Sequence, residues 1–215
     1  MSTTTENENK QTEDYGEIES WDDLDIKRDL LRGIYSHGFE NPSPIQKKAI
    51  LPFINKRDVI AQAQSGTGKT GAFTIGSLER VDLKSKTTQV LIVSPTRELS
   101  HQIFDVIKQI GSQLKGLTVQ LLVGGTPTED DIRLLNEDVP HIIVGCPGRC
   151  HDMMRRNQVK SDNIKLIVLD EADEMLSCGF KDQVYDVFKH LNQDVQIGLF
   201  SATIPTELER LTNKI

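Results

Sequence analysis

Short apolar runs rich in valine, isoleucine and leucine recur along the chain from residue 58 onward. They predict six strands: Asp58–Ala61, Gln89–Ser94, Val119–Val123, His141–Gly145, Lys165–Leu169 and Val195–Phe200. Helix-like segments follow them in turn: Lys69–Arg80, Arg97–Lys115, Thr128–Asn136, Gly148–Asn157, Gly179–Leu191 and Thr206–Asn213. Such alternation predicts an α/β fold in which helices cover both faces of a parallel sheet.

The polar and acidic N-terminal segment breaks this pattern. Residues 1–19 are rich in Ser, Thr, Asn and Glu and hold little that could be buried, so we expect a disordered tail. Two further helices are predicted, Asp29–Ser36 and Ser43–Asn55, the second entered through Pro42-Ser43-Pro44. Without an internal repeat or a linker, residues 20–215 are expected to form one domain.

Charge and cysteine content exclude several classes of protein. The net charge is −7, and six acids against Lys10 place −5 of it in the first twenty residues. Because the chain is not basic overall, any nucleic-acid contact must be a local surface. Cys146, Cys150 and Cys178 form no Cys-x-x-Cys pair, which indicates free thiols in a reducing compartment. No apolar run approaches the roughly 18 residues of a membrane helix. Residues 1–20 have no apolar core, so we expect no secretory signal. We expect a cytoplasmic protein, with a nuclear location as the alternative, and no membrane partner.

A glycine-rich stretch lies between the first predicted strand and the helix after it, at Ala63-Gln64-Ser65-Gly66-Thr67-Gly68-Lys69-Thr70. Glycines there let successive backbone N–H groups point at phosphate oxygens, and the helix adds its positive dipole end. Lys69 can reach the β- and γ-phosphates of a nucleotide, and the Thr70 hydroxyl can bind magnesium. The general phosphate-loop pattern begins with Gly, where this chain has Ala63. The alternative is a chance glycine turn before a helix.

The fifth predicted strand runs directly into acids at Asp170, Glu171 and Asp173. Strand ends in α/β proteins lie at the edge where ligands bind. We predict that Asp170 holds magnesium, through water, and that Glu171 orients or deprotonates the attacking water, which makes Lys69, Asp170 and Glu171 the candidate catalytic set. The alternative is an ordinary acidic helix N-terminus, and this is our interpretation of Glu174.

Together with their neighbours, these residues resemble the DEAD-box RNA helicases of superfamily 2, which implies a RecA-like P-loop domain. Asp170-Glu171-Ala172-Asp173 is the four-residue signature, and Ala63 is ordinary in this family's loop. The resemblance covers about residues 20–215 and includes the following motifs: Phe39 to Gln46 with Trp21 upstream, Pro95-Thr96-Arg97-Glu98-Leu99, Gly124-Gly125, Pro147-Gly148-Arg149 and Ser201-Ala202-Thr203. The stretch Leu169–Ser177 is most similar to the eukaryotic initiation factor 4A branch.

The resemblance implies a role for each motif. Gln46 has an amide donor and acceptor that suit adenine, Phe39 offers a flat face for the base, and Pro44 lies in the same ATP-binding motif. RNA-backbone contacts, which carry no base information, are implied for Pro95, Thr96, Arg97, Gly125, Gly148 and Arg149. Asp173, Ser201 and Thr203 are implied to couple hydrolysis to strand separation. Taken singly, these residues also fit a plain helix start, glycine turns, a surface arginine and a strand-end turn. Cys146 stands where the family usually has Thr.

The family has two such domains, and the second supplies arginine fingers and half of the RNA contacts. No His-Arg-x-Gly-Arg-x-x-Arg element occurs in this chain. An arginine finger is worth about 10³–10⁵ in rate in related phosphoryl-transfer systems. We therefore expect this polypeptide to be one domain of a larger protein, a partial sequence or a truncated gene product. We expect it to bind ATP weakly, to hydrolyse it very slowly and not to unwind duplexes. Expected partners are RNA, a second RecA-like domain and translation-initiation scaffold proteins. The alternatives are a non-catalytic ATP- or RNA-binding module that regulates a partner and, more distantly, a small-molecule kinase.

Overall fold

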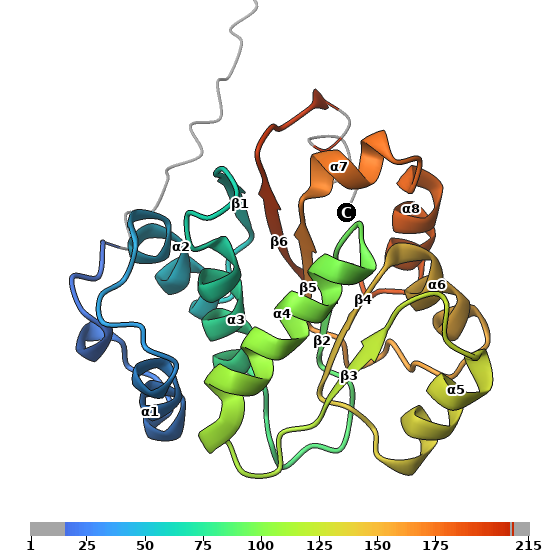
Figure 1. Ribbon diagram of the computed structural model, residues 1–215, viewed down its shortest axis with the longest axis horizontal. Coiled ribbons are helices and arrows are strands. Elements are labelled where there is room, and N and C mark those ends of the chain that lie inside the picture. The colour runs from blue at the N-terminus through green and yellow to red at the C-terminus, as the bar shows by residue number, and fades with distance from the viewer. Residues whose placement is uncertain (1–15, 207, 209–215) are drawn as a thin grey trace, which may run out of the picture.

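A single all-parallel sheet forms the centre of the computed structural model, which describes residues 16–206 and 208 (Figure 1). Its six strands lie in the order β1-β6-β5-β2-β4-β3. Their bounds are β1 Val59–Gln62, β2 Val90–Val93, β3 Val119–Leu122, β4 Ile142–Gly145, β5 Leu166–Asp170 and β6 Gln196–Ser201. Because all strands run the same way, their carboxyl ends meet at one edge, toward the top of Figure 1.

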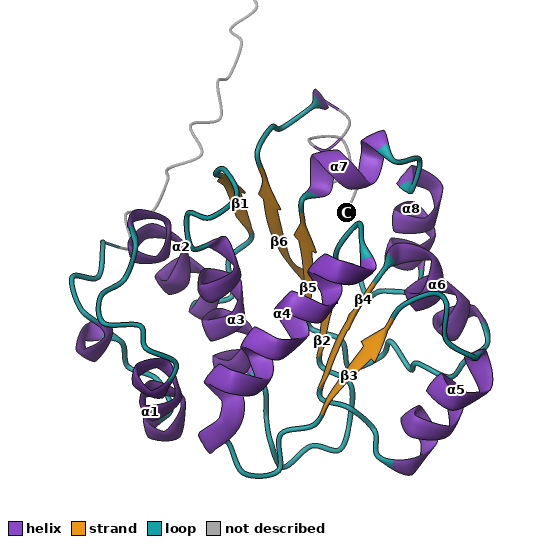
Figure 2. Ribbon diagram, in the orientation of Figure 1, coloured by secondary structure: helices purple, strands orange, loops and turns teal. Residues whose placement is uncertain are grey.

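Helices cover both faces of this sheet (Figure 2). The first face carries 3₁₀ helix η1 and four α-helices: η1 Trp21–Asp23, α1 Arg28–Ser36, α2 Pro44–Ile54, α3 Lys69–Arg80 and α4 Arg97–Ile110, which 3₁₀ helix η2 Gly111–Gln113 extends. The second face carries α5 Thr128–Glu137, α6 Pro147–Arg155, α7 Ala172–Ser177 and α8 Lys181–Lys189. The α/β fold with a parallel sheet is thus confirmed.

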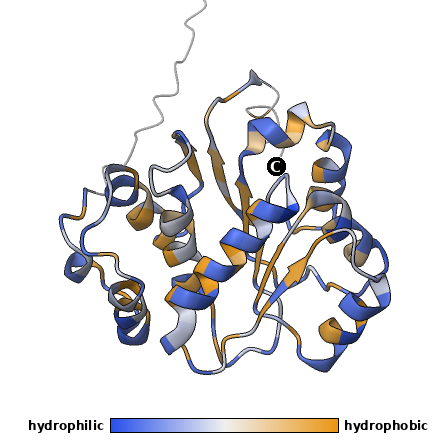
Figure 3. Ribbon diagram, in the orientation of Figure 1, coloured by the Kyte–Doolittle hydropathy of each residue, from blue (hydrophilic) through white to orange (hydrophobic). Residues whose placement is uncertain are grey.

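Two apolar layers follow from the alternation of side chains along the strands. Ile92 and Val168 point into the first layer, whereas Leu91 and Ile167 point into the second. Every residue of the inner strands is buried, and Figure 3 shows these strands as largely apolar. The edge strands β1 and β3 alternate between buried and more exposed positions. A strand buried on both faces therefore reads as a continuous apolar run.

The predicted strands agree with the structure to within one residue at each end, but some helices do not. The helix predicted over Arg97–Lys115 ends at Ile110, because Gly111 weakens it and a 3₁₀ turn lets Leu114 fold back into the core. The short helices η1 and α7 were not predicted as separate elements, since neither has enough residues to show a period. The predicted helix Thr206–Asn213 lies largely outside the described residues.

The expected tail falls mostly outside the described part of the chain, which begins at Gly16. Ile18 is buried in the first apolar layer, and the flanking Glu17 and Glu19 pair with Lys48 and Lys47 of α2. The packed region therefore extends at least two residues further toward the N-terminus than the expected boundary at residue 20. Within the described residues, no helix is both long enough and apolar enough to cross a membrane.

Candidate active site

The loop after β1 and the acids after β5 meet at the carboxyl edge of the sheet. Lys69, the first residue of α3, places its Nζ 2.9 Å from Oε1 of Glu171, which follows β5 directly. The Lys69 side chain is only 4% exposed and that of Glu171 18%. The two motifs that are about a hundred residues apart in sequence are thus one site, held by a largely desolvated ion pair.

Backbone conformation shapes the loop between β1 and α3. Gly66 and Gly68 have φ of 81° and 99°, the left-handed region that favours glycine, and Gly68 is the N-cap of α3. Gln64 and Thr67 close the turn through a 2.8 Å bond from the Thr67 hydroxyl to the Gln64 carbonyl. Ser65 and its neighbours are exposed, and Thr70 is half-buried. The Ala63 N–H donates a hydrogen bond to the Ser201 carbonyl. The loop therefore presents an open backbone cradle in front of a helix N-terminus.

Asp170 and Glu171 differ sharply in environment. Asp170 is 1% exposed, and burial raises its pKa to about 7, with Lys69 opposing and Glu171 adding to the rise. Its Oδ1 accepts the backbone N–H of Glu171 at 3.0 Å. Glu171 has φ 50° and ψ 50°, a left-handed conformation that costs about 1–3 kcal/mol for a residue other than glycine. This left-handed conformation turns the chain from β5 into α7, with the Glu171 carboxylate next to Lys69.

The third acid, Asp173, ties α7 to the end of β6. Its Oδ2 accepts the Thr203 N–H at 3.0 Å and the Thr203 hydroxyl at 2.7 Å, while its own N–H donates to Oγ of Ser201 at 3.1 Å. Burial opposes ionisation of Asp173, but the hydrogen bonds from Thr203 and Ser201 outweigh it and hold the pKa below its usual value. The structure thus brings the three residues of the proposed coupling set together.

Helix α2 packs its N-terminus directly on the phosphate loop. Gln46 is 4% exposed; its Oε1 accepts the Ser43 N–H at 2.8 Å and its Nε2 donates to the Gly68 carbonyl at 3.1 Å. A Cβ at Gly71 would lie 2.5 Å from that nitrogen and 2.8 Å from the Phe39 ring, so only glycine permits this approach. The Gln46 amide is therefore bonded to the loop rather than exposed, with one N–H and one lone pair left.

Phe39 is fixed from the N-terminal side. The Trp21 indole donates to the Phe39 carbonyl at 3.0 Å, and the two rings stack with centroids 6.1 Å apart. Pro44, the first residue of α2, is exposed. Trp21 is fully buried, which explains how a residue well upstream of the motif helps to position it.

A separate hollow of about 470 Å³ gathers the basic and glycine motifs at the same edge of the sheet. It is lined by Pro95, Thr96, Arg97, Glu98, Gly124, Cys146, Gly148, Arg149 and Phe180. Phe180, at the N-terminus of α8, was not among the predicted residues, because nothing around it has a phosphate-binding pattern. Its only signal is its place after Gly179, which has φ 80° and ends the short helix α7.

The two arginines of this hollow are used differently. Arg97 is exposed and lies over Gly125, where a Cβ would come within 2.2 Å of its guanidinium. Arg149 is largely buried, pairs with Asp131 of α5 and donates to the Thr126 carbonyl at 2.9 Å. Burial raises the pKa of Asp131 although Arg149 opposes the rise. Arg149 therefore anchors the glycine loop, whereas Arg97 is the open cation.

The site fits a nucleoside triphosphate with a divalent cation. Backbone N–H groups at a helix N-terminus suit phosphate, and the buried Asp170 carboxylate with the Thr70 hydroxyl suits Mg²⁺, which takes few protein ligands together with phosphate oxygens and water. Among the described residues, no group of three or more His, Cys, Asp or Glu side chains is placed to hold a metal by itself.

Comparison with known proteins yields consistent matches. The sequence profile of the DEAD/DEAH box helicase family matches residues 43–211. The chain is 52% identical to the "ATP-dependent RNA helicase eIF4A" of Yarrowia lipolytica, covering 94% of this chain and 51% of that protein. It is 51% identical to "Eukaryotic initiation factor 4A" of Caenorhabditis elegans, covering 92% and 48%. The chain thus spans about half the length of these curated relatives.

Solved structures show the same likeness. A DEAD box protein from Methanococcus jannaschii aligns with a TM-score of 0.87 and 37% identity, over 92% of this chain and 54% of that one. Saccharomyces cerevisiae Dbp5 bound to RNA and ADP BeF3 aligns with a TM-score of 0.79 and 37% identity, over 92% and 50%.

Proposed function

Because the chain belongs to the DEAD/DEAH box helicase family, we propose that it is the ATP-binding half of an ATP-dependent RNA helicase related to translation initiation. The observation that carries the proposal is the convergence of Lys69 and Glu171, 2.9 Å apart, beside the buried Asp170. The relatives near 50% identity are initiation factor 4A proteins, which supports the place in translation and a cytoplasmic location, with the nucleus as the alternative.

The phosphate loop and the N-terminal end of α2 bind ATP. The N–H groups from Ser65 to Lys69 take the phosphates, and Lys69 neutralises the terminal ones. Gln46 reads the adenine edge with its remaining N–H and lone pair, while Phe39 and Pro44 border the base. Because Gln46 also bonds the Gly68 carbonyl, occupation of the base site and the shape of the phosphate loop are linked.

Hydrolysis falls to the acids. Asp170 and Thr70 would hold Mg²⁺, which would neutralise charge that develops on the phosphate oxygens. Glu171 orients or deprotonates the attacking water. Lys69 must exchange Glu171 for phosphate as its main partner, and this exchange frees the Glu171 carboxylate for the water. The ion pair seen here is the resting arrangement of both groups.

RNA binds in the hollow that Arg97 and Gly148 line, with Gly125 under the Arg97 guanidinium. Arg97 supplies the open charge, and the glycines with Pro95 and Thr96 allow close approach of a phosphate backbone. Arg149 acts indirectly, since Asp131 and Thr126 already engage its guanidinium. Binding of this kind is independent of base sequence.

Asp173, Ser201 and Thr203 couple the two sites. Their hydrogen bonds join the acidic turn after β5 to the end of β6, so a shift of the acids on nucleotide binding changes the position of both strand ends. A second RecA-like domain completes the ATP site with arginines, and translation-initiation scaffold proteins are further partners. The half described here therefore binds ATP weakly and turns it over slowly.

The test is an RNA-stimulated ATPase assay on the longer protein that contains both domains. Glu171→Gln should abolish turnover while ATP binding, measured by calorimetry, survives. Lys69→Ala should weaken nucleotide binding itself. Normal hydrolysis by Glu171→Gln would refute the water-orienting role, and unchanged nucleotide binding by Lys69→Ala would refute the phosphate role.

A further inference from the structure

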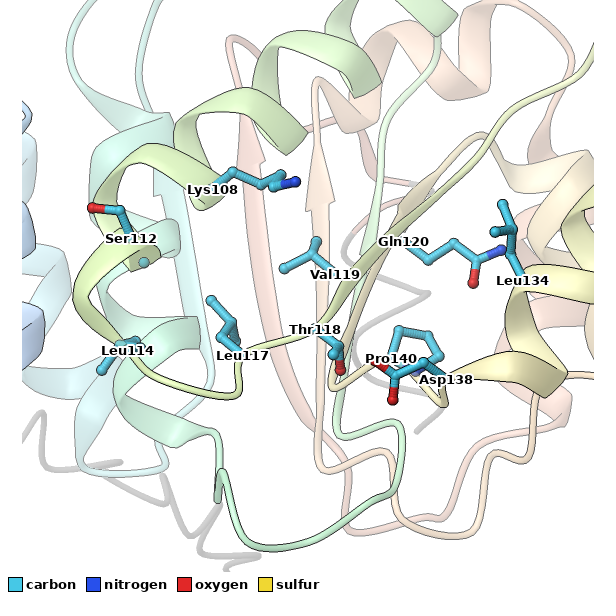
Figure 4. A pocket seen from close by; sticks show the side chains of 11 residues that line it. Lys108, Ser112, Leu114, Leu117, Thr118, Val119, Gln120, Leu134, Asp138 and Pro140 are labelled. Atoms are coloured by element: carbon cyan, nitrogen blue, oxygen red, sulfur yellow. The ribbon is translucent and has the colours of Figure 1, made fainter.

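A second hollow, of about 420 Å³, lies beside strand β3 and shares no lining residue with the ATP and RNA sites (Figure 4). Its floor is Thr118 with the first two residues of β3, Val119 and Gln120. Among the described strands, β3 pairs only with β4, so its other side carries no neighbouring strand. An unpaired strand edge is a template for another extended chain.

The hydrogen-bond ladder shows which backbone groups face this open side. The carbonyls of Thr118 and Leu122 accept N–H groups from the β4 side. Because a strand alternates with a period of two, the N–H and C=O groups of Val119 and Leu121 point outward. An added strand would therefore find two residues of β3 with both backbone groups directed toward it.

The two walls of the hollow have different chemistry. On the α4 side lie apolar groups, Leu114, Leu117 and Val119, with the Lys108 ammonium drawn over the Phe104 ring 5.5 Å from its centroid. Figure 4 shows Val119 on this side, near Leu117 and Lys108. The cavity here suits an aliphatic side chain.

On the α5 side, Gln120 reaches toward Leu134, and Asp138 lines the hollow just after the end of the helix (Figure 4). Helix α5 carries three further exposed carboxylates, Glu129, Asp130 and Glu137. Arg133 of the same helix pairs with both Asp130, at 3.7 Å, and Glu137, at 3.1 Å. Asp138 pairs with the exposed Lys86 at 3.8 Å. The α5 wall therefore carries an excess of negative charge.

We propose that this edge is a docking surface for an extended segment of a partner protein in which apolar and basic residues alternate. Successive side chains of an added strand point to opposite faces of the sheet. One set would enter the apolar α4 side, and the next would meet the carboxylates of the α5 side. Alternation, rather than composition alone, is what this surface recognises.

The probe is a fluorescent peptide with alternating valine and lysine, titrated against the chain by fluorescence polarisation. Two matched controls are a peptide of the same composition with the valines and lysines in separate blocks, and one with glutamate in place of lysine. The alternating peptide should bind at least about tenfold more tightly than either control, and its addition should shift the amide resonances of Val119 and Leu121.

Charge reversal on the protein tests the wall assignment. In Glu137→Lys/Asp138→Lys, changes that also suit a helix C-terminus, preference should switch to the glutamate peptide. Val119→Lys should weaken binding of the lysine peptide at least tenfold, and Asp182→Lys, an exposed change on α8, should have no effect.

The proposal is overturned if the block peptide binds equally well, if the charge reversal leaves the preference unchanged, or if the resonance shifts fall elsewhere. It is also overturned if Val119→Lys instead abolishes self-association seen by light scattering without peptide, because the occupant would then be a second copy of this chain. None of these readouts involves ATP, so the result is independent of the function proposed above.

Discussion

The ion pair between Lys69 and Glu171 makes a prediction about ATP affinity. Replacing Glu171 by Gln removes a negative charge beside the nucleotide site, and we expect ATP to bind several-fold more tightly. The reason is that Lys69 no longer has to give up a carboxylate 2.9 Å away before it can bind phosphate.

The magnitude follows from the geometry of the pair. At 2.9 Å the Coulomb attraction is about 5–6 kcal/mol for an effective dielectric constant near 20. Desolvation of two groups that are 4% and 18% exposed cancels most of this, so the expected net coupling is about 1–3 kcal/mol. In Glu171→Gln, Asp170 remains as a partner for Lys69, which limits the loss of stability to about 1 kcal/mol. Lys69→Met leaves two adjacent carboxyl groups without a cation and should cost about 3 kcal/mol.

Urea denaturation of the two single variants and the double variant gives the coupling free energy, and calorimetry with Mg·ATP gives the affinity. All variants are made in this chain, so that their ATP affinities are compared without a contribution from arginines of a second domain. Lower ATP affinity in Glu171→Gln, or a coupling free energy near zero, would refute the idea that this pair restrains Lys69.

Three further predictions follow from contacts elsewhere in the molecule. Asp173→Asn should lose about 1 kcal/mol in urea denaturation, because the two bonds from Thr203 lose their charged acceptor, and a loss indistinguishable from zero would contradict that role. Gly71→Ala should cost about 1–3 kcal/mol and reduce the preference for ATP over GTP in competition binding, since its Cβ would displace Gln46; unchanged selectivity would count against Gln46 as the base reader. Burial lowers the pKa of His141 in the folded protein, and Lys86 lowers it further. Below about pH 6.5 the unfolded chain therefore binds more protons than the folded one, and the free energy of unfolding should fall as the pH falls. An equal slope in His141→Asn would show that another group is responsible.

The hydrophobic pattern was sufficient to predict the six strands because buried parallel strands read as continuous apolar runs. The motif from Leu166 to Glu171 illustrates this, since its apolar run gave the strand and its acids marked the ligand-binding edge. The helix from Arg97 was predicted too long, because its apolar period continues past Gly111 although the chain turns there. Local patterns thus give the type of an element more reliably than its end.

The identity of the site residues is a property of the sequence, but their state is not. Lys69, Asp170 and Glu171 were recognisable from spacing and residue type. Their pairing depends on the left-handed backbone at Glu171, which no sequence pattern marks. Likewise, the sequence predicted an RNA contact for both Arg97 and Arg149. In the structure Asp131 forms an ion pair with Arg149 and leaves Arg97 exposed.

What the sequence determined by itself is therefore the alternation of elements, the phosphate loop and the acidic strand end, because each depends on neighbours within a few positions. What only the tertiary structure decided is which groups share a partner: Lys69 with Glu171, Gln46 with the Gly68 carbonyl, and Asp173 with Thr203. Among the described strands, it also left β3 unpaired on one side, beside the acidic helix α5. The physical reason is that burial, charge pairing and free strand edges arise from residues distant in the chain, whose approach is fixed only when the sheet and its helices pack together.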